Sequence, residues 1–189
     1  MILGPFSDHI KVKNKDELLA STNIHSKIHQ TKIGTMGGID LHHYSVNIPG
    51  MEGRPDKWEV SLAHTPNEKG EGVTLVGFGR NGDYTGESSD FAASGPVFLR
   101  EALPKILAHH YKTMKEEGKN PTTFTMGAED VRPEMVRRKQ RVYQSMFSDF
   151  DHDQSSETQH VGEIFKNMAG KPHDMPMFSF RIPRHLTIV

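Results

Sequence analysis

The chain has 189 residues, of which 34% are hydrophobic and none is cysteine, and its formal net charge is −1. This length indicates one domain, and the balanced charge gives no long-range field that would attract nucleic acid or an acidic membrane. The absence of cysteine excludes disulfide scaffolds, thiol nucleophiles and cysteine-based zinc sites. No apolar run approaches the roughly 18 residues of a membrane helix, so we expect no membrane partner.

The first part of the chain, residues 1–57, is predicted to be an N-terminal extension packed on a core formed by residues 58–189. Asn14 is placed to cap a short helix with Leu18 on its inner face. Residues 39–48 have the composition of a strand, although both faces mix polar and apolar side chains. The start of the chain lacks the basic and apolar regions of a signal peptide, so we expect no secretion.

The core begins with a predicted β-hairpin. Trp58, Val60 and Leu62 alternate with polar residues, which is the pattern of a strand with one buried face. A polar turn follows, and residues 73–78 form the second predicted strand. Residues 79–95 are rich in glycine, serine and acidic residues and are predicted to be a loop.

A long helix follows this loop. From Pro96 to Gly118 apolar residues recur at steps of three and four, which is the strongest helix signal in the chain. Pro104 should kink this helix because it removes a backbone hydrogen bond. A short strand at residues 122–126 and a second helix from Pro133 come next.

The last part of the core contains a loop, a short helix and a strand. Residues 148–159 are predicted to be a polar surface loop, residues 160–168 a helix, and residues 177–182 a strand. Together the elements predict an α/β or α+β fold with a mostly antiparallel sheet and two main helices.

From Trp58 to Ile182 the order is strand, strand, loop, helix, strand, helix, strand. This order resembles the core of the GNAT family of N-acetyltransferases, and residues 138–143 look like the late helix of that family that carries a tyrosine. The resemblance implies a GNAT-like topology. In an active member, a glycine-containing turn after the second strand binds the pyrophosphate of acetyl-CoA through backbone N–H groups.

This resemblance makes Gly79, Gly82 and Gly86 the candidate cofactor-binding residues and Tyr143 the candidate general acid. The corresponding run, residues 80–90, lacks the glycine spacing of the family. Its acidic side chains would also lie near an anionic pyrophosphate, which electrostatics disfavours. We therefore expect no cofactor and no catalytic residue.

Several short motifs also resemble those of small proteins of tailed bacteriophages. These proteins share a Trp- and Tyr-rich hairpin and a helix with Arg and Tyr. They also share three local patterns, represented here by Thr85-Gly86, Val97-Phe98 and Phe124-Thr-Met-Gly-Ala128. The resemblance implies a phage source, synthesis in the host cytoplasm, and the virion as a second candidate location.

Twelve histidines and an acidic run raise the question of a metal site. His25 and His29 are spaced to share a helix face, but the His-Glu-x-x-His motif is absent. Asp149, Asp151 and Asp153 alternate like the start of a calcium-binding loop, without the glycine and glutamate that such a loop needs. We predict packing or surface histidines, a solvated acidic loop and no metal.

A cluster of cations on the second helix is the candidate interaction site: Arg132, Arg137, Arg138, Lys139 and Arg141. A solvated helix face is one interpretation, and contact with an acidic protein surface or with phosphates is the other. The balanced charge and the lack of interleaved aromatic residues favour a solvated face and argue against nucleic acid.

These observations predict a non-catalytic phage structural or accessory protein that acts by protein–protein contacts in a virion or larger assembly. Its partners would be other proteins of the assembly or further copies of the chain in a homo-oligomer. Two alternatives stay open. One is an acyl-CoA-dependent N-acetyltransferase with an atypical cofactor loop, and the other is a small phage inhibitor of a host protein.

Overall fold

A computed structural model describes residues 28–36, 39–49, 54–66, 71–83, 94–127, 133–146, 151–168, 170–171 and 174–182. The strands in these ranges are β1 (Ile28–Met36), β2 (Ile39–Pro49), β3 (Pro55–Pro66), β4 (Glu71–Arg80), β5 (Asn120–Gly127) and β6 (Met177–Arg181). The helices are α3 (Ser94–Val97), the π-helical segment η3 (Phe98–Ala102), α4 (Leu103–Glu116), α5 (Pro133–Met146) and α6 (Ser156–Met168).

The described strands form one mixed sheet in the order β1-β2-β3-β4-β5-β6. Neighbouring strands are antiparallel, except that residues 71–76 of β4 pair in parallel with residues 120–126 of β5. The parallel pair is connected by α3, η3 and α4, because parallel strands need a long crossover. The fold is therefore α+β, and the predicted mostly antiparallel sheet is confirmed.

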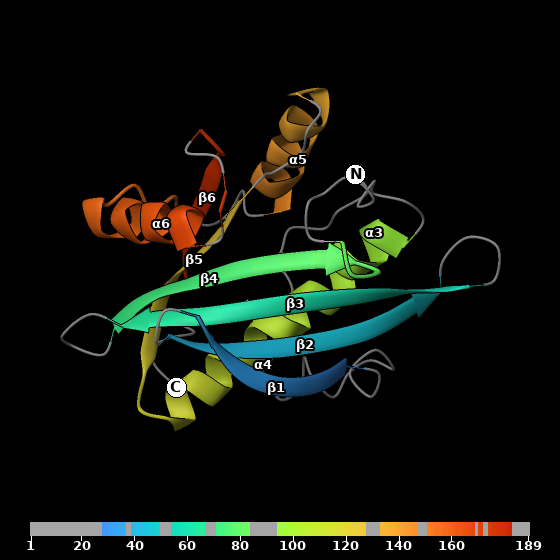
Figure 1. The fold of residues 1–189 in the computed structure, drawn as a ribbon, viewed down its shortest axis with the longest axis horizontal. Coiled ribbons are helices and arrows are strands. Elements are labelled where there is room, and N and C mark those ends of the chain that lie inside the picture. Colours follow the sequence, from blue (N-terminus) through green and yellow to red (C-terminus); the bar gives the residue numbers. More distant parts are fainter. Residues whose placement is uncertain are drawn as a thin grey trace.

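Helices cover both faces of the sheet. On one face α4 runs beneath β2 and β3 (Figure 1), and the side chains of α4, η3 and α5 share a core with the alternate residues of β2 to β6. On the other face Val161 of α6 packs with Ala63, Val73 and Leu75. The predicted inward face of Trp58, Val60 and Leu62 is confirmed, since all three are buried.

A chain of aromatic rings connects the two halves of the main core. Trp58 of β3 stacks on Phe98 of η3 with ring centroids 4.2 Å apart and planes 9° apart. Phe78 of β4 lies 5.3 Å from Phe98 and 6.2 Å from Tyr143 of α5. Tyr143 lies 5.7 Å from Phe178 of β6. Aromatic contacts thus join β3, β4, α5 and β6.

The predicted irregularity at Pro104 takes the form of a π-helical segment. The N–H of Leu103 bonds to the carbonyl of Phe98, which gives the wider turn of a π-helix. Pro104 has no N–H to donate to the carbonyl four residues earlier, so the α-helical hydrogen-bond pattern is interrupted immediately before it. The helix ends at Glu116, and Gly118 just beyond it has a φ of +76°, which confirms the predicted glycine cap.

Some predictions of secondary structure are wrong. Helix α6 begins earlier than predicted, at Ser156, because the hydroxyl of Ser155 accepts the N–H of Thr158 at 3.3 Å and caps the helix. His29 lies in β1, so it does not occupy a helix face. The predicted helix at Asn14 and the position of His25 lie outside the described residues.

Histidines gather in the core beside α4. His42, His64 and His110 are buried, and the rings of His42 and His110 meet edge to face with centroids 5.1 Å apart. Within the described part of the chain the ring nitrogens of His110 have no hydrogen-bond partner. The pKa of His110 is lowered to about 3, mainly by burial and in addition by the charges of His42, His64, His109 and Lys119.

This pKa shift predicts a loss of stability in mild acid. The unfolded chain protonates His110 near its ordinary pKa of 6.5, whereas the folded chain keeps it neutral down to about pH 3. The free energy of unfolding should therefore be fully retained above pH 6.5 and decline as pH falls, by up to about 1.4 kcal/mol per pH unit for one histidine. Urea denaturation at pH 7, 6 and 5 measures this slope.

The variant His110→Leu should reduce that slope, and His160→Leu, at an exposed position, is the control for the substitution itself. Some slope should remain in His110→Leu, because burial also lowers the pKa of His42. Equal slopes in His110→Leu and the unaltered protein would contradict this account of the buried histidine.

The aromatic contacts predict which side chains carry the most stability. Phe98 is fully buried, so Phe98→Ala should lower the free energy of unfolding by about 3–5 kcal/mol. Ile164 of α6 is 38% exposed, so Ile164→Ala is the control and should cost less than about 1 kcal/mol. Chemical denaturation with fluorescence of Trp58 measures both, and equal losses would show that the aromatic chain is not the main support.

Candidate functional site

The turn after β4 is closed by its own hydrogen bonds. Asn81 and Gly82 have positive φ values of 54° and 83°. Arg80 and Asp83 exchange backbone bonds of 3.1 and 3.0 Å, and the N–H of Asn81 bonds to the carbonyl of Lys57 at 2.7 Å. The N–H groups of Arg80, Asn81 and Asp83 are therefore committed to protein carbonyls.

A carboxylate lies at the start of the α3 helix beside this turn. Asp56 accepts the Ser94 hydroxyl at 2.5 Å and the Asn81 amide at 3.0 Å. The indole N–H of Trp58 donates to Ser94 Oγ at 3.0 Å, which holds that hydroxyl in place. Burial alone would raise the pKa of Asp56, but the hydrogen bonds of Ser94 and Asn81 and the charge of Arg80 lower it below its usual range. Asp56 is thus an anion at neutral pH.

The candidate cofactor-binding glycines do not form one cradle. Gly79 lies in β4, paired opposite Glu59, and is not part of a loop as predicted. Gly82 is at the tip of the closed turn, where its positive φ explains the glycine. Gly86 lies outside the described residues. A pyrophosphate at the start of α3 would meet the Asp56 carboxylate, and like charges repel.

Tyr143, the candidate general acid, lies in the core. It is 2% exposed and packs between Phe78 and Phe178. Burial raises the pKa of its hydroxyl well above the ordinary value. A general acid works best with a pKa near the operating pH, so this environment suits a structural tyrosine.

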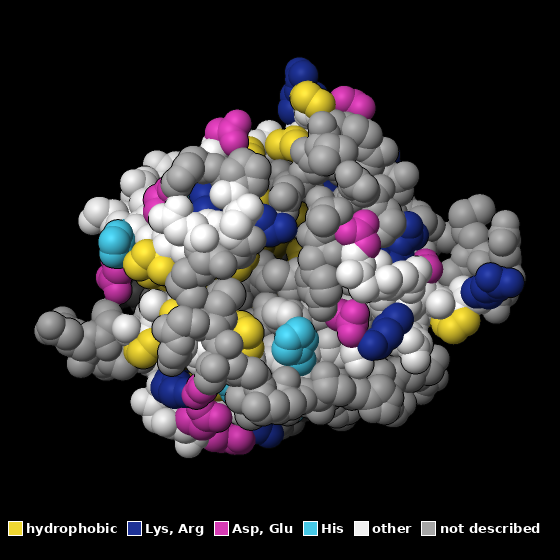
Figure 2. All heavy atoms as spheres, viewed as in Figure 1, with side chains coloured by type: hydrophobic (Ala, Val, Ile, Leu, Met, Phe, Trp, Pro, Cys, Tyr) yellow, Lys and Arg dark blue, Asp and Glu magenta, His cyan; other side chains and the backbone are white. Residues whose placement is uncertain are grey.

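The described cations of the predicted interaction site do not share one face of α5. Arg137, Arg138 and Arg141 are exposed, and we call them the α5 basic face. Lys139 points to another side of the helix and is buried, with 5% exposed, because it is turned away from Arg137 by the helical repeat. Arg132 lies outside the described residues. Elsewhere on the surface viewed in Figure 2, coloured basic and acidic side chains are interspersed.

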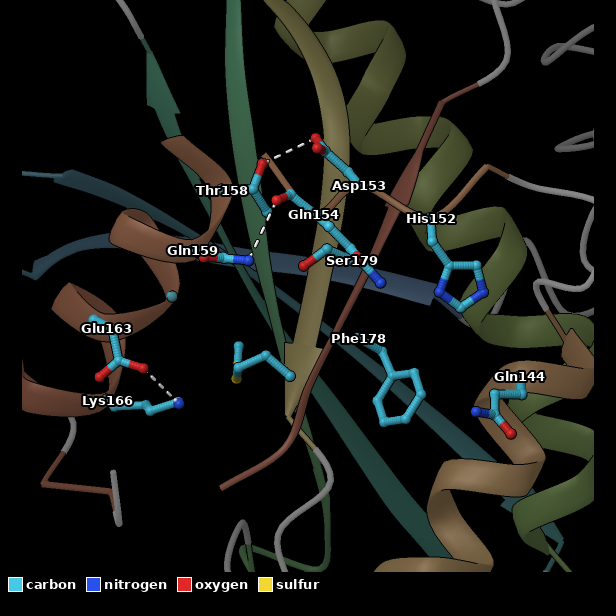
Figure 3. Close-up of a pocket in the computed structure, with 12 residues that line it drawn as sticks. Gln144, His152, Asp153, Gln154, Thr158, Gln159, Glu163, Lys166, Phe178 and Ser179 are labelled. Carbon is cyan, nitrogen blue, oxygen red and sulfur yellow. Dashed lines mark hydrogen bonds and ion pairs between the residues drawn. The ribbon is translucent and has the colours of Figure 1, made fainter. Parts of the chain in front are cut away.

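A polar cleft of about 540 Å³ lies at the end of the sheet between α5, α6 and β6 (Figure 3). Gln144 of α5 stands on one side, and Glu163 and Lys166 of α6 stand on the other. Lys166 Nζ and Glu163 Oε1 form an ion pair of 2.8 Å, and the lysine side chain is only 8% exposed. Phe178 and Ser179 of β6 lie between these two walls.

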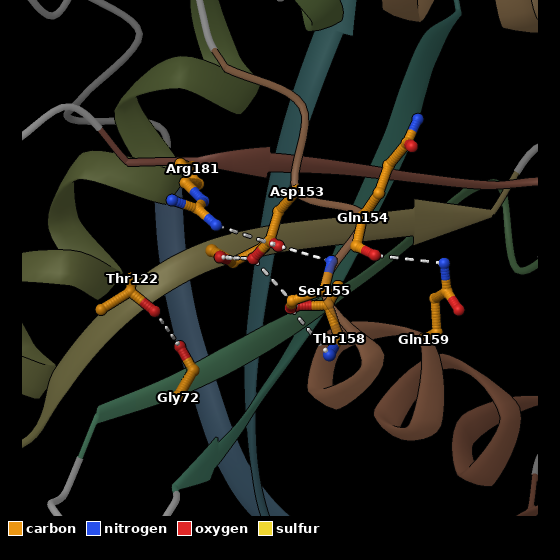
Figure 4. Close-up of polar contacts among 9 residues, drawn as sticks. Gly72, Thr122, Asp153, Gln154, Ser155, Thr158, Gln159 and Arg181 are labelled. Atoms are coloured by element: carbon orange, nitrogen blue, oxygen red, sulfur yellow. Dashed lines mark hydrogen bonds and ion pairs between the residues drawn. The ribbon is translucent and has the colours of Figure 1, made fainter.

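Asp153 joins the elements around this cleft (Figure 4). Its carboxylate accepts the hydroxyls of Thr123 at 2.6 Å and Thr158 at 2.9 Å, and the N–H of Ser155 at 3.0 Å. Arg181 lies 3.7 Å away. Burial alone would raise the pKa of Asp153, but these hydrogen bonds outweigh it and lower the pKa to about 2. The predicted solvated loop is wrong here, since Asp153 is 8% exposed.

The outer edge of β6 is partly covered by the segment that contains Asp153. Asp153 N–H donates to the carbonyl of Ser179 at 2.9 Å, and Arg181 N–H donates to the carbonyl of Asp151 at 2.8 Å. His152 and Phe180 form the antiparallel bridge between these two bonds. The segment thus acts as a very short additional strand at this end of the sheet.

Sequence reasoning missed most of the cleft. Of its lining residues only Asp153 had been singled out, and for a different reason. The run Asp153-Gln-Ser155 before a helix is a capping signal that could have placed the start of α6. The glutamines of the cleft carry no such signal, because glutamine is common on any exposed helix.

Among the residues that the structure describes, no group of three histidine, aspartate or glutamate side chains could hold a metal ion. In that same part of the chain no helix is both long enough and apolar enough to cross a membrane.

No protein-family model, curated protein or solved structure matches the chain. The relation to GNAT enzymes and to phage proteins therefore stays a prediction from the sequence.

The Asp153 contacts predict a large effect of one carboxylate. Asp153→Ala leaves the buried hydroxyl of Thr123 and the start of α6 without their acceptor, so the free energy of unfolding should fall by about 2–4 kcal/mol at pH 7. Asp151→Ala is the matched control, because it keeps the backbone carbonyl that Arg181 uses.

Urea denaturation of both variants tests this. The contribution of Asp153 is present above its ordinary pKa of 3.8 and should be lost as pH falls toward 2. Similar stabilities of Asp153→Ala and Asp151→Ala at pH 7 would contradict the role given to this carboxylate.

Proposed function

We propose that this protein is a non-catalytic structural or accessory component of a tailed bacteriophage, which acts through protein–protein contacts in a virion or larger assembly. One observation carries the proposal. The N–H groups of Arg80, Asn81 and Asp83 are committed to protein carbonyls, and the Asp56 carboxylate lies at the start of the following helix. An anionic cofactor is disfavoured at the place where the family resemblance would put it.

A GNAT-like topology is part of this proposal. The order β3, β4, α3–η3–α4, β5, α5, β6 follows the order that the resemblance implies, with α6 added before the last strand. The antiparallel β3–β4 pair and the parallel β4–β5 pair support it. We infer that such a core, without a cofactor site, serves here as a scaffold for binding surfaces.

The exposed surfaces support binding. The α5 basic face presents three arginines whose planar guanidinium groups suit bidentate contact with carboxylates: Arg137, Arg138 and Arg141. The balanced charge of the whole chain gives no general attraction for nucleic acid, so we propose an acidic protein surface as the partner of this face.

Native mass spectrometry of the untagged protein from its natural source tests the proposed function. The proposal expects a ligand-free chain in a symmetric oligomer or bound to other proteins of a particle. A monomer that carries the added mass of CoA or acetyl-CoA would overturn it and favour the alternative of an N-acetyltransferase. A complex with a host protein alone would favour the alternative of a phage inhibitor.

The basic face gives a prediction for the same measurement. Arg137→Glu with Arg141→Glu reverses two exposed charges and should weaken the assembly at least about tenfold, because like charges would then face each other. Arg54→Glu, at an exposed position just before β3, is the control and should leave the assembly unchanged. Equal losses from both variants would mean that net charge, and not this face, controls the contact.

A further inference from the structure

We propose that the cleft at the outer edge of β6 binds an extended, uncharged polar peptide segment of a partner protein, which continues the antiparallel pairing on β6. This inference rests on the proposed function, since it names the kind of partner segment that one site of the protein takes.

The proposed peptide site begins at the outer edge of β6. β6 is the last strand in the order of the described sheet. Its outward backbone groups at Ser179 and Arg181 pair with Asp153 and Asp151. Backbone groups on one edge recur at every second residue, so those of Met177 face the same side. Met177, Phe178 and Ser179 line the cleft, so the cleft lies where the short strand would continue.

The reason why the chain does not continue this strand is local. After pairing with Ser179, Asp153 turns its carboxylate to Thr123 and Thr158 and starts α6. The segment therefore leaves the edge of β6 at Asp153, and the cleft opens beyond it (Figure 3). A peptide entering the cleft would take the position that the departing chain leaves.

The side chains that line the cleft suit a peptide better than a charged ligand. Gln144 of α5, Gln154 of the connecting segment and Gln159 of α6 line the cleft, and amide side chains both donate and accept, as peptide groups do. The charges of the walls are internally matched, because Lys166 pairs with Glu163 and Asp153 is surrounded by donors. A volume of about 540 Å³ is within the usual range of ligand sites.

Gly162 provides the variants for a test. It lies on α6 in the lining of the cleft, and a methyl group added there would meet Met177 Cγ at 3.8 Å, an ordinary contact. Gly162→Ala should therefore fold and leave the cleft usable. Gly162→Leu extends a larger side chain into the cleft. Gln144→Trp blocks the opposite wall from an exposed position, in case Gly162→Leu disturbs folding.

The experiment selects peptides from a displayed random heptapeptide library on the full-length protein and measures the affinity of a synthetic selected peptide by fluorescence anisotropy. Gly162→Leu and Gln144→Trp should each weaken binding at least about tenfold, and Gly162→Ala should retain it. N-methylation of single peptide bonds should abolish binding at one position, the N–H that meets Met177, because the outward backbone groups of Ser179 and Arg181 are already paired within the chain.

Three results would overturn the inference. They are no selected peptide, binding that neither blocking variant weakens, or binding that no single N-methylation abolishes. Binding of inorganic phosphate or acetate in the cleft, displaced by Gly162→Leu, would instead show a small-anion site. If no peptide binds but native mass spectrometry shows an assembly, this inference fails and the proposed function remains. A monomer loaded with CoA would refute the proposed function, whether or not a peptide binds.

Discussion

The stacked contact between Trp58 and Phe98 is the interaction on which the rest of the structure depends. It fixes the start of the crossover helix on the β3–β4 hairpin, and that crossover delivers β5 to its parallel place beside β4. Phe78 and Tyr143 extend the contact to α5, so the same aromatic chain holds the second half of the molecule on the first. Each aromatic ring buries a large apolar area, which suits these rings to joining the elements of a chain in which only 34% of residues are hydrophobic.

The same contact influences the electrostatics of the site where a cofactor would be expected. The indole N–H of Trp58 holds Ser94, and Ser94 in turn donates to Asp56. Packing therefore keeps a carboxylate at the start of the helix, which disfavours a bound pyrophosphate. At the other end of the sheet, Asp153 ties β5 and β6 to α6 and ends the short strand beside the cleft. Both proposals thus rest on carboxylates that hydrogen bonds hold in place.

Local patterns were enough to predict much of the fold. The alternation of Trp58, Val60 and Leu62 predicted β3, and Gly118 marked the end of the long helix, because both signals depend only on near neighbours. The burial of Asp153 could not be predicted, since its partner Thr123 is distant in sequence and is brought near only by the sheet. The closed turn after β4 was missed because its bond to the carbonyl of Lys57 joins two strands.

The central claim is that this chain binds through its surfaces and does not use acetyl-CoA. Isothermal titration of acetyl-CoA into the untagged full-length protein tests it most directly. The account predicts no saturable heat, because the N–H groups of Arg80, Asn81 and Asp83 are already bonded and Asp56 repels the pyrophosphate. Saturable one-to-one binding, accompanied by transfer of the acetyl group to an added amine, would contradict it.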